Sequence, residues 1–116
     1  MPADPKRLPA AFFLSARGTE PVRDWLKELS DADRRALGYD IGVLEFGWPV
    51  GMPLCRALGG GLWEVRTSLA SNRIARVMFC IAHGHMVLLH GFIKKTRKTP
   101  AADLELGRAR QKEVEQ

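Results

Sequence analysis

The spacing of apolar residues changes twice in the first half of the chain. Residues 8–15 form a compact apolar run that ends at a turn-like Ala-Arg-Gly sequence, which is typical of a strand. Over residues 22–29 the apolar positions recur at intervals of three and four, with Pro21 in the first turn, and this predicts a helix. Ser30 resembles a helix cap, and helical spacing continues over residues 37–44. The pattern therefore predicts a strand followed by a two-helix hairpin.

The second half of the chain reads as strands. Residues 46–61 contain five glycines and two prolines, so we expect mostly loop there. Three β-rich runs follow, separated by short polar turns: residues 62–69, 72–82 and 85–93. Such closely spaced runs predict an antiparallel meander. In the last run apolar residues occupy both odd and even positions, which indicates a central strand covered on both faces.

A final helix completes the predicted fold. Thr99 can cap a helix that has Pro100 at its first position, with Asp103 early in the helix and Arg110 among the cations late in it. The expected fold class is α+β: an antiparallel sheet, made of the N-terminal strand and the three-stranded meander, with a two-helix hairpin and a C-terminal helix. We expect one domain over residues 1–116, with residues 1–7 flexible.

Composition narrows the class of protein only slightly. The chain has 116 residues, 46% of them hydrophobic, and no apolar stretch that could span a membrane. Its start has a basic pair and an apolar stretch, as secretory signals do, but the stretch is short and contains Pro9, so we expect the cytoplasm. Cys55 and Cys80 lack metal-type spacing, and no metal site or cofactor is expected. Phosphate-loop and nucleophile-elbow motifs are missing, which disfavours nucleotide-dependent enzymes and serine hydrolases.

Charge suggests a polyanionic partner. Lysine and arginine exceed aspartate and glutamate by 18 to 13, giving a net charge of +5. Many of the cations fall on or near the ends of the predicted strands: Arg66, Arg73, Arg76, Lys94, Lys95, Arg97 and Lys98. A cleft lined by such side chains could hold a phosphodiester and stabilise developing charge, and RNA would supply its own nucleophile, the 2'-hydroxyl.

These residues also have structural interpretations. Arg66 could form a cross-strand ion pair with Glu64, and Arg76, within an apolar strand, needs Glu64 or solvent. His90, which shares a strand face with Lys94, could be a half-buried histidine with a hydrogen-bond partner. The cationic run could be a solvated surface.

Three segments carry a family resemblance. GLWEVR (61–66), NRIARVMF (72–79) and VLLHGFIKKTRKTP (87–100) resemble the HigB-like, phage-derived branch of the RelE/ParE toxin superfamily. The resemblance implies a RelE-like fold and a type II toxin that acts as a ribosome-dependent mRNA endonuclease. It also implies a small antitoxin partner, often with a helix-turn-helix domain.

The resemblance implies roles for most of the cations. Arg73 corresponds to an arginine that contacts the scissile phosphate, and we expect Arg66 to hold the phosphoryl oxygens together with it. Lys94 and Lys95 correspond to a basic pair that stabilises transition-state charge and protonates the leaving group. For the remaining cations we expect contacts with nucleic-acid backbone: Arg76, Arg97 and Lys98.

Two departures from the family pattern leave the general base open. Glu64 and Arg66 fall where RelE-like enzymes place two basic residues, so only Arg66 keeps the charge. The terminal tyrosine of some relatives is missing, because the only tyrosine is Tyr39 in the second predicted helix. His90 and Glu64 remain candidates for the base. The alternatives to RNA cleavage are a ParE-like inhibitor of DNA gyrase, which needs no base, and an inactive binding module.

Overall fold

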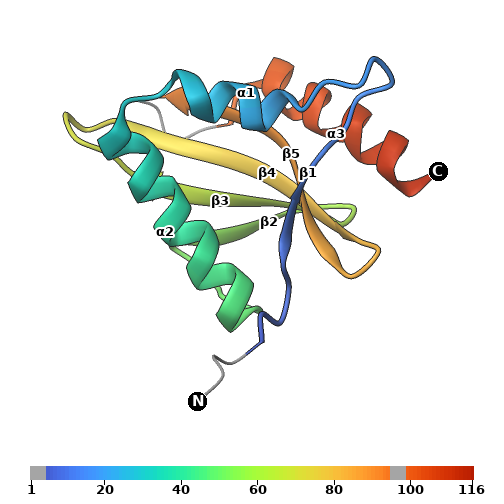
Figure 1. The fold of residues 1–116 in the computed structure, drawn as a ribbon, viewed down its shortest axis with the longest axis horizontal. Helices are drawn as coiled ribbons and strands as arrows, with labels where there is room; N and C mark the ends of the chain where they lie inside the picture. Colours follow the sequence, from blue (N-terminus) through green and yellow to red (C-terminus); the bar gives the residue numbers. More distant parts are fainter. Residues whose placement is uncertain (1–4, 95–98) are drawn as a thin grey trace.

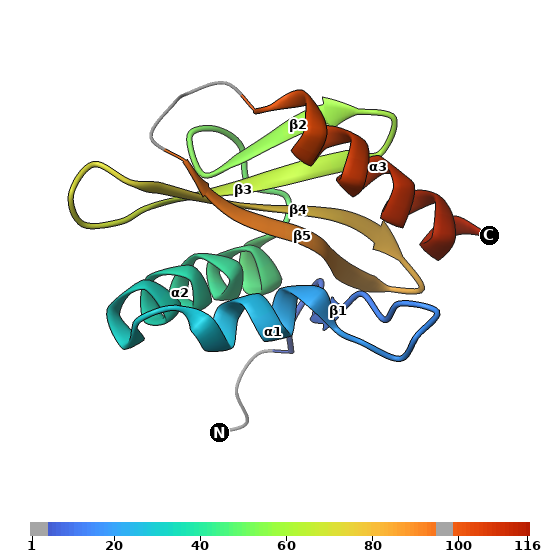
Figure 2. The same ribbon diagram turned by 90° about the horizontal axis from the view of Figure 1, so that it is seen from above.

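A mixed sheet lies between one pair of helices and a third helix. The computed structural model describes residues 5–94 and 99–116. In chain order the elements are β1 (Ala10–Phe12), α1 (Pro21–Glu28), α2 (Asp31–Gly47), β2 (Cys55–Gly59), β3 (Leu62–Ser68), β4 (Ile74–Ala82), β5 (His85–Lys94) and α3 (Ala101–Glu115). Helices α1 and α2 cover one face of the sheet, and α3 covers the other (Figures 1 and 2). The α+β class is as predicted.

Helices α1 and α2 begin where the sequence predicts, but the N-cap of α3 is Pro100 rather than the predicted Thr99, whose hydroxyl bonds Glu64 instead of a helix amide. Pro21 occupies the first turn of α1, and the Ser30 side chain accepts a hydrogen bond from the Asp33 amide at the start of α2. That bond satisfies one of the amides that have no partner inside a helix. None of the helices in the described ranges is long and apolar enough to cross a bilayer. Part of the predicted flexible start, residues 1–4, lies outside the described residues.

The sheet corrects two predictions. Its strand order is β1-β5-β4-β3-β2, and the antiparallel β3-β4-β5 meander is confirmed. β1, however, pairs in parallel with β5, so the all-antiparallel prediction was wrong. An apolar pattern determines which faces a strand buries, but it does not determine the direction of the strand.

The second correction is a strand that was not predicted, within residues 46–61, which were expected to be mostly loop. They contain β2, which pairs antiparallel with β3. Gly60 and Gly61, with positive φ values of 63° and 81°, form the turn between the two strands, and Gly59, the last residue of β2, has a positive φ of 91°. Glycine adopts this conformation without the steric cost that other residues incur. The same glycines that indicated a loop therefore close a hairpin.

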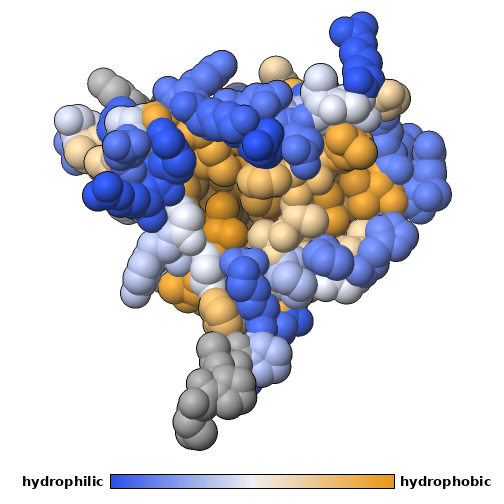
Figure 3. Space-filling model, in the orientation of Figure 1, coloured by the Kyte–Doolittle hydropathy of each residue, from blue (hydrophilic) through white to orange (hydrophobic). Residues whose placement is uncertain are grey.

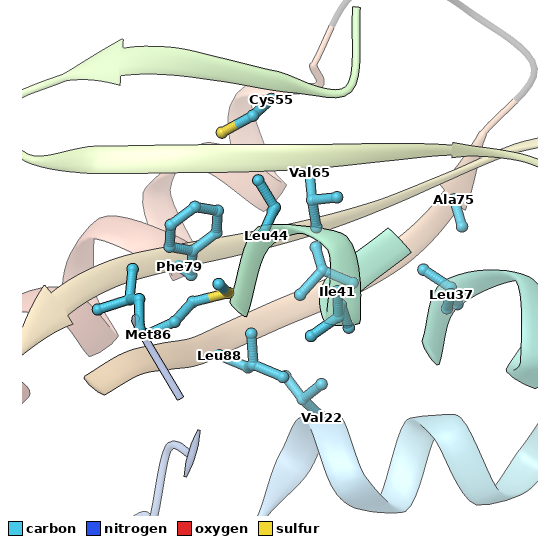
Figure 4. Packing of buried hydrophobic residues seen from close by; sticks show 12 residues of the cluster. Val22, Leu37, Ile41, Leu44, Cys55, Val65, Ala75, Phe79, Met86 and Leu88 are labelled. Atoms are coloured by element: carbon cyan, nitrogen blue, oxygen red, sulfur yellow. The ribbon is translucent and has the colours of Figure 1, made fainter. Parts of the chain in front are cut away.

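The apolar core has two parts, one on each face of the sheet. Figure 4 shows side chains of α1 and α2, such as Val22 and Leu44, pointing toward strand residues such as Phe79. A smaller cluster under α3 contains Met78 and Leu89. Burying each such side chain stabilises the fold by about 1.5–3 kcal/mol. The outer face that carries α1, α2 and β1 also exposes hydrophobic residues in its middle, with hydrophilic residues around them (Figure 3).

Candidate functional site on the sheet face under α3

A buried polar network joins the start of α3 to the sheet. Thr99 donates a hydrogen bond to Glu64 Oε2 (2.8 Å) and accepts one from Arg76 Nη1 (3.0 Å). Arg76 Nη1 also lies 3.6 Å from Glu64 Oε1, and both charged side chains are fully buried. Burial lowers the pKa of the Arg76 guanidinium, an effect that Glu64 opposes. The network therefore positions the first turn of α3 over β3 and β4.

A histidine and a carboxylate meet one turn further along α3. Met78 of β4 pairs with His90, whereas Phe79 pairs with Leu88, so β5 has one extra residue there. This bulge leaves His90 facing α3, where its Nε2 lies 2.7 Å from Asp103 Oδ1. The ring also stacks on Phe92, with centroids 5.4 Å apart. An Nε2–H donated to the carboxylate leaves the lone pair on Nδ1.

The rest of α3 is anchored through backbone carbonyls. Arg110 donates to Leu89 O (2.9 Å), at the bulge next to His90. Arg108 donates to Leu58 O, and Gln111 donates to Gly60 O, both in the β2-β3 hairpin. These bonds place α3 along the sheet, so the distance between His90 and Asp103 depends on the whole helix.

Two further predicted residues lie on this face. Arg66 of β3 pairs directly with Arg76 of β4, and Lys94 at the end of β5 shares its side of the strand with Phe92. Lys94 is exposed, whereas Arg66 is half-buried. The structure therefore brings together Arg66, Arg76, His90 and Lys94. Arg76 has no exposed surface, so a contact with RNA would require Thr99 to move away.

Arg73 lies apart from this group. It precedes β4 and forms two hydrogen bonds with Asp33 in the first turn of α2, at 2.8 and 3.0 Å. Arg73 holds the pKa of the Asp33 carboxyl below its usual range, and Asp33 raises the pKa of Arg73. Since α2 covers the face opposite α3, Arg73 is on the other side of the sheet. The remaining predicted cations, Lys95, Arg97 and Lys98, lie outside the described residues.

Neither cysteine is suited to nucleophilic chemistry. Burial raises the pKa of Cys55 and of Cys80 to about 11, so both thiols are protonated at neutral pH. Over residues 5–94 and 99–116, no group of three or more histidine, cysteine or acidic side chains could hold a metal ion. The chemistry that the described side chains can offer is proton transfer and charge stabilisation.

Sequence reasoning missed three residues of the site. Thr99 and Asp103 were identified only as features of a helix start, and Arg110 only as a cation late in the same helix. The threonine-proline start and the early aspartate did predict the helix. They could not show which strand residues the helix would meet, because that depends on the packing of α3.

Comparison with known proteins gives one assignment. The chain matches the family model described as "Phage derived protein Gp49-like (DUF891)" over residues 24–112. No curated protein matches it. The matched range begins in α1 and ends in α3, so it includes all the side chains just described under α3. The chain therefore belongs to the phage-derived Gp49-like family, a RelE-like toxin family of type II toxin-antitoxin systems.

Proposed function

We propose that the protein is a HigB-like toxin that cleaves mRNA on the ribosome and so arrests translation. One observation carries the proposal: Asp103 holds His90 on the sheet face that also presents Arg66 and Lys94. A histidine oriented by a carboxylate is a common general base, and nearby cations favour a phosphodiester. Family membership supports the same class of function.

The reaction requires no group from outside the protein and its RNA. His90 Nδ1 takes the proton of the ribose 2'-hydroxyl, and the 2'-oxygen attacks the adjacent phosphorus. The bond from phosphorus to the 5'-oxygen breaks, and that oxygen receives a proton, with Lys94 or Lys95 as donor. The products are a 2',3'-cyclic phosphate and a 5'-hydroxyl. General-base catalysis of this kind contributes about 10²–10⁴-fold in rate.

The two candidates for the base are not equivalent in the structure. Glu64 is fully buried and accepts a hydrogen bond from Thr99, so its carboxylate is already engaged. Once Nε2 donates to Asp103, the other ring nitrogen of His90 has no partner among the described residues, and we therefore favour His90 as the base.

Arg66 is suited to stabilise charge on the phosphoryl oxygens, because it lies on the same face and is not fully buried. The family resemblance implies a contact between Arg73 and the scissile phosphate. Arg73 could make that contact only after its ion pair with Asp33 has opened. Arg97 and Lys98 remain candidates for holding the RNA backbone, as does Arg76 if Thr99 moves away.

We propose two kinds of partner for this cytoplasmic toxin. The ribosome and its mRNA are polyanions that attract a chain of net charge +5. The other partner is a small cognate antitoxin, and a helix-turn-helix protein is the expected type.

The decisive experiment is induced expression from a tightly regulated promoter, followed by mapping of mRNA ends on translating ribosomes. We expect growth arrest with new cuts within codons, and loss of both in His90→Gln. His85→Gln is a matched control, because His85 is exposed at the β4-β5 turn. Growth arrest without new mRNA ends contradicts the proposal. Arrest with DNA damage would instead indicate a gyrase inhibitor.

A further inference from the structure

Arg56, on the edge strand β2, lies in line with His90 across the sheet. In the register of the strands, His90 pairs with Met78, and Met78 pairs with Glu64. Glu64 in turn pairs with Arg56. Residues that pair directly on neighbouring strands point to the same face of a sheet, so Arg56 shares the α3 face with Glu64 and His90. Leu58, two residues further along β2, packs against the apolar cluster under α3 and agrees with this orientation.

Three arginines surround the Glu64 carboxylate on this face. Arg66 pairs with Arg76 in the row of residues next to Arg56 and Glu64. Glu64 forms its ion pair with Arg76, and neither Arg56 nor Arg66 has an ion-pair partner among the described residues. Burial lowers the pKa of Arg76 most, Glu64 opposes that effect, and the charges of Arg66 and Arg56 lower the pKa further. Three guanidinium groups and one carboxylate leave an excess of positive charge that an anion would balance.

Arg56 and Arg66 can reach an anion in solvent. Both residues are half-buried, whereas Arg76 has no exposed surface. The exposed Lys94 lies at the same end of the sheet, because β2 and β4 begin where β3 and β5 end. The accessible cations of the described residues therefore extend along this end of the α3 face, from β5 to the β2 edge.

The opposite face is less suited to a polyanion. Helices α1 and α2 together carry six carboxylates and four cations. Arg73, the cation at the edge of that face, is already paired with Asp33. Because a phosphate backbone is attracted by an excess of cations, it is drawn to the α3 face.

We propose that Arg56 binds a non-reacting phosphate of the RNA backbone at the β2 edge of the sheet. This inference rests on the proposed RNA substrate and adds a contact that holds the strand, not a group that reacts. Phosphate contacts position a nucleic acid without reading its bases, so Arg56 contributes affinity that is independent of sequence.

The phosphate at Arg56 is not the one that His90 would activate. Three strand spacings separate Arg56 from His90, about 14 Å. Met78 and Glu64, which lie between them in the same row, are fully buried on the face that α3 covers. Since these two side chains and α3 fill the space between Arg56 and His90, the two residues contact different phosphates of one strand.

An acidic segment of the antitoxin is the main competing occupant. Its carboxylates would also balance the charge of Arg56 and Arg66. RNA is favoured because the same face holds the pair of His90 and Asp103, which a surface that only binds a protein does not need. The experiment therefore includes the antitoxin as a separate ligand.

The salt dependence of binding measures phosphate contacts without cleavage. We would titrate the full chain with single-stranded 2'-O-methyl RNAs, which cannot be cut, at several KCl concentrations. Each phosphate contact with a single strand contributes about 0.7 to the slope of log K against log salt. Arg56→Gln should therefore lower the magnitude of the slope by about 0.7 and weaken binding equally for all base sequences. Arg56→Lys keeps the charge and should keep the slope.

Arg35→Gln is the matched control, because Arg35 is exposed on α2, on the opposite face. It removes the same charge and should leave the slope unchanged. A wild-type slope in Arg56→Gln would overturn the proposal, and so would an equal loss of slope in Arg35→Gln, which would indicate net charge alone. If Arg56→Gln does not fold, the wild type still decides: its Arg56 amide resonance should shift on addition of RNA, and an unshifted resonance would refute the contact.

Cleavage separates this inference from the proposed function. On translating ribosomes Arg56→Gln should cut mRNA at the same positions as the wild type but require more protein, whereas His90→Gln should bind RNA with the wild-type slope and not cut. A lower slope in Arg56→Gln without cleavage by any form would refute the endonuclease and keep the phosphate site. Cleavage by the wild type with an unchanged slope in Arg56→Gln would refute the phosphate site alone. So would weaker binding of the antitoxin by Arg56→Gln with unchanged binding of RNA.

Discussion

The two faces of the sheet are built from alternate residues of the same strands, yet they bury different chemistry. Toward α1 and α2, β3 and β4 present apolar side chains, among them Val65 and Phe79, both fully buried. Toward α3 the same strands present Glu64 and Arg76, which are equally buried. Burial is therefore similar on the two faces, but among the described strand residues only those that face α3 combine it with charge.

This difference means that the face under α1 and α2 contributes mainly packing energy, whereas the face under α3 mainly determines where side chains lie. Dispersion and the hydrophobic effect are non-directional. The sheet face under α1 and α2, called the helix-pair face below, can therefore lose part of one apolar contact and retain the others. A buried ion pair has a large desolvation cost and stabilises only when its geometry is satisfied. On the α3 face the network adds little net stability, but it determines where α3 starts and hence where Asp103 meets His90.

The largest effect we expect comes from breaking the network on one side. Glu64→Ala removes the carboxylate that faces Arg76 and accepts from Thr99. Loss of one partner of a buried pair destabilises by about 3–5 kcal/mol. Urea denaturation measures the free energy of unfolding directly.

Replacing both charges is the control. The double variant Glu64→Met, Arg76→Leu fills the space with apolar groups and should unfold with a free energy close to that of the wild type. It should nevertheless lose RNA cleavage, because α3 is no longer positioned through Thr99. A double variant as unstable as Glu64→Ala would show that the network contributes stability itself.

The two faces can also be compared by adding a methyl group at one glycine on each face. A Cβ on Gly91 would meet the ring of Trp25, which is rigid, on the helix-pair face. A Cβ on Gly107 of α3 would meet the sulfur of Met78, at the flexible end of its side chain. Gly91→Ala should destabilise by about 1–3 kcal/mol through overpacking. Gly107→Ala should be nearly neutral, because alanine favours a helix by about 1 kcal/mol over glycine. Equal shifts in thermal midpoint would contradict this asymmetry.

Local patterns in the sequence predicted most of the fold. The helical spacing before Leu29 and the Thr99-Pro100 start gave α1 and α3, and the short turns gave the meander. The parallel pairing of β1 and the presence of β2 could not be predicted in the same way. Both depend on which sheet edge is left free once the helices have packed, and that is a tertiary property.

Prediction of the site had the same limit. Strand parity correctly required a partner for Arg76, and Glu64 provides it. Parity could not show that the bulge in β5 would turn His90 toward Asp103, because one extra residue reverses the alternation. Arg73 was grouped with the other cations by its charge, its place at a strand end and the family resemblance, whereas its partner is on α2.

Thr67 places a buried hydroxyl among the apolar strand side chains of the helix-pair face, and its removal should have a smaller, stabilising effect. Thr67→Val keeps the shape of the side chain and removes an Oγ1 that has no partner among the described residues. The unfolding free energy should rise by about 1 kcal/mol, because an unsatisfied buried group is lost. Thr67→Ser, which retains the hydroxyl and removes a methyl group, should be less stable than the wild type. A destabilised valine variant would mean that the hydroxyl is satisfied in the folded protein.

The smallest effect we expect comes from the ion pair between Arg73 and Asp33, at the edge of the helix-pair face, and it is seen only at low pH. Arg73 lowers the pKa of Asp33, so the folded state binds this proton less readily than the unfolded state, where an aspartate has a pKa of about 3.9. The resulting stability is fully present above that value and disappears as the pH falls through the lower folded-state pKa. Asp33→Asn should therefore flatten the decrease in thermal midpoint below about pH 4. Asp31→Asn removes a charge from the same helix turn but not the contact with Arg73, so it separates the ion pair from the helix dipole. If the decrease in thermal midpoint at low pH is the same in Asp33→Asn as in the wild type, solvent screens the ion pair completely, since the Arg73 side chain is 31% exposed.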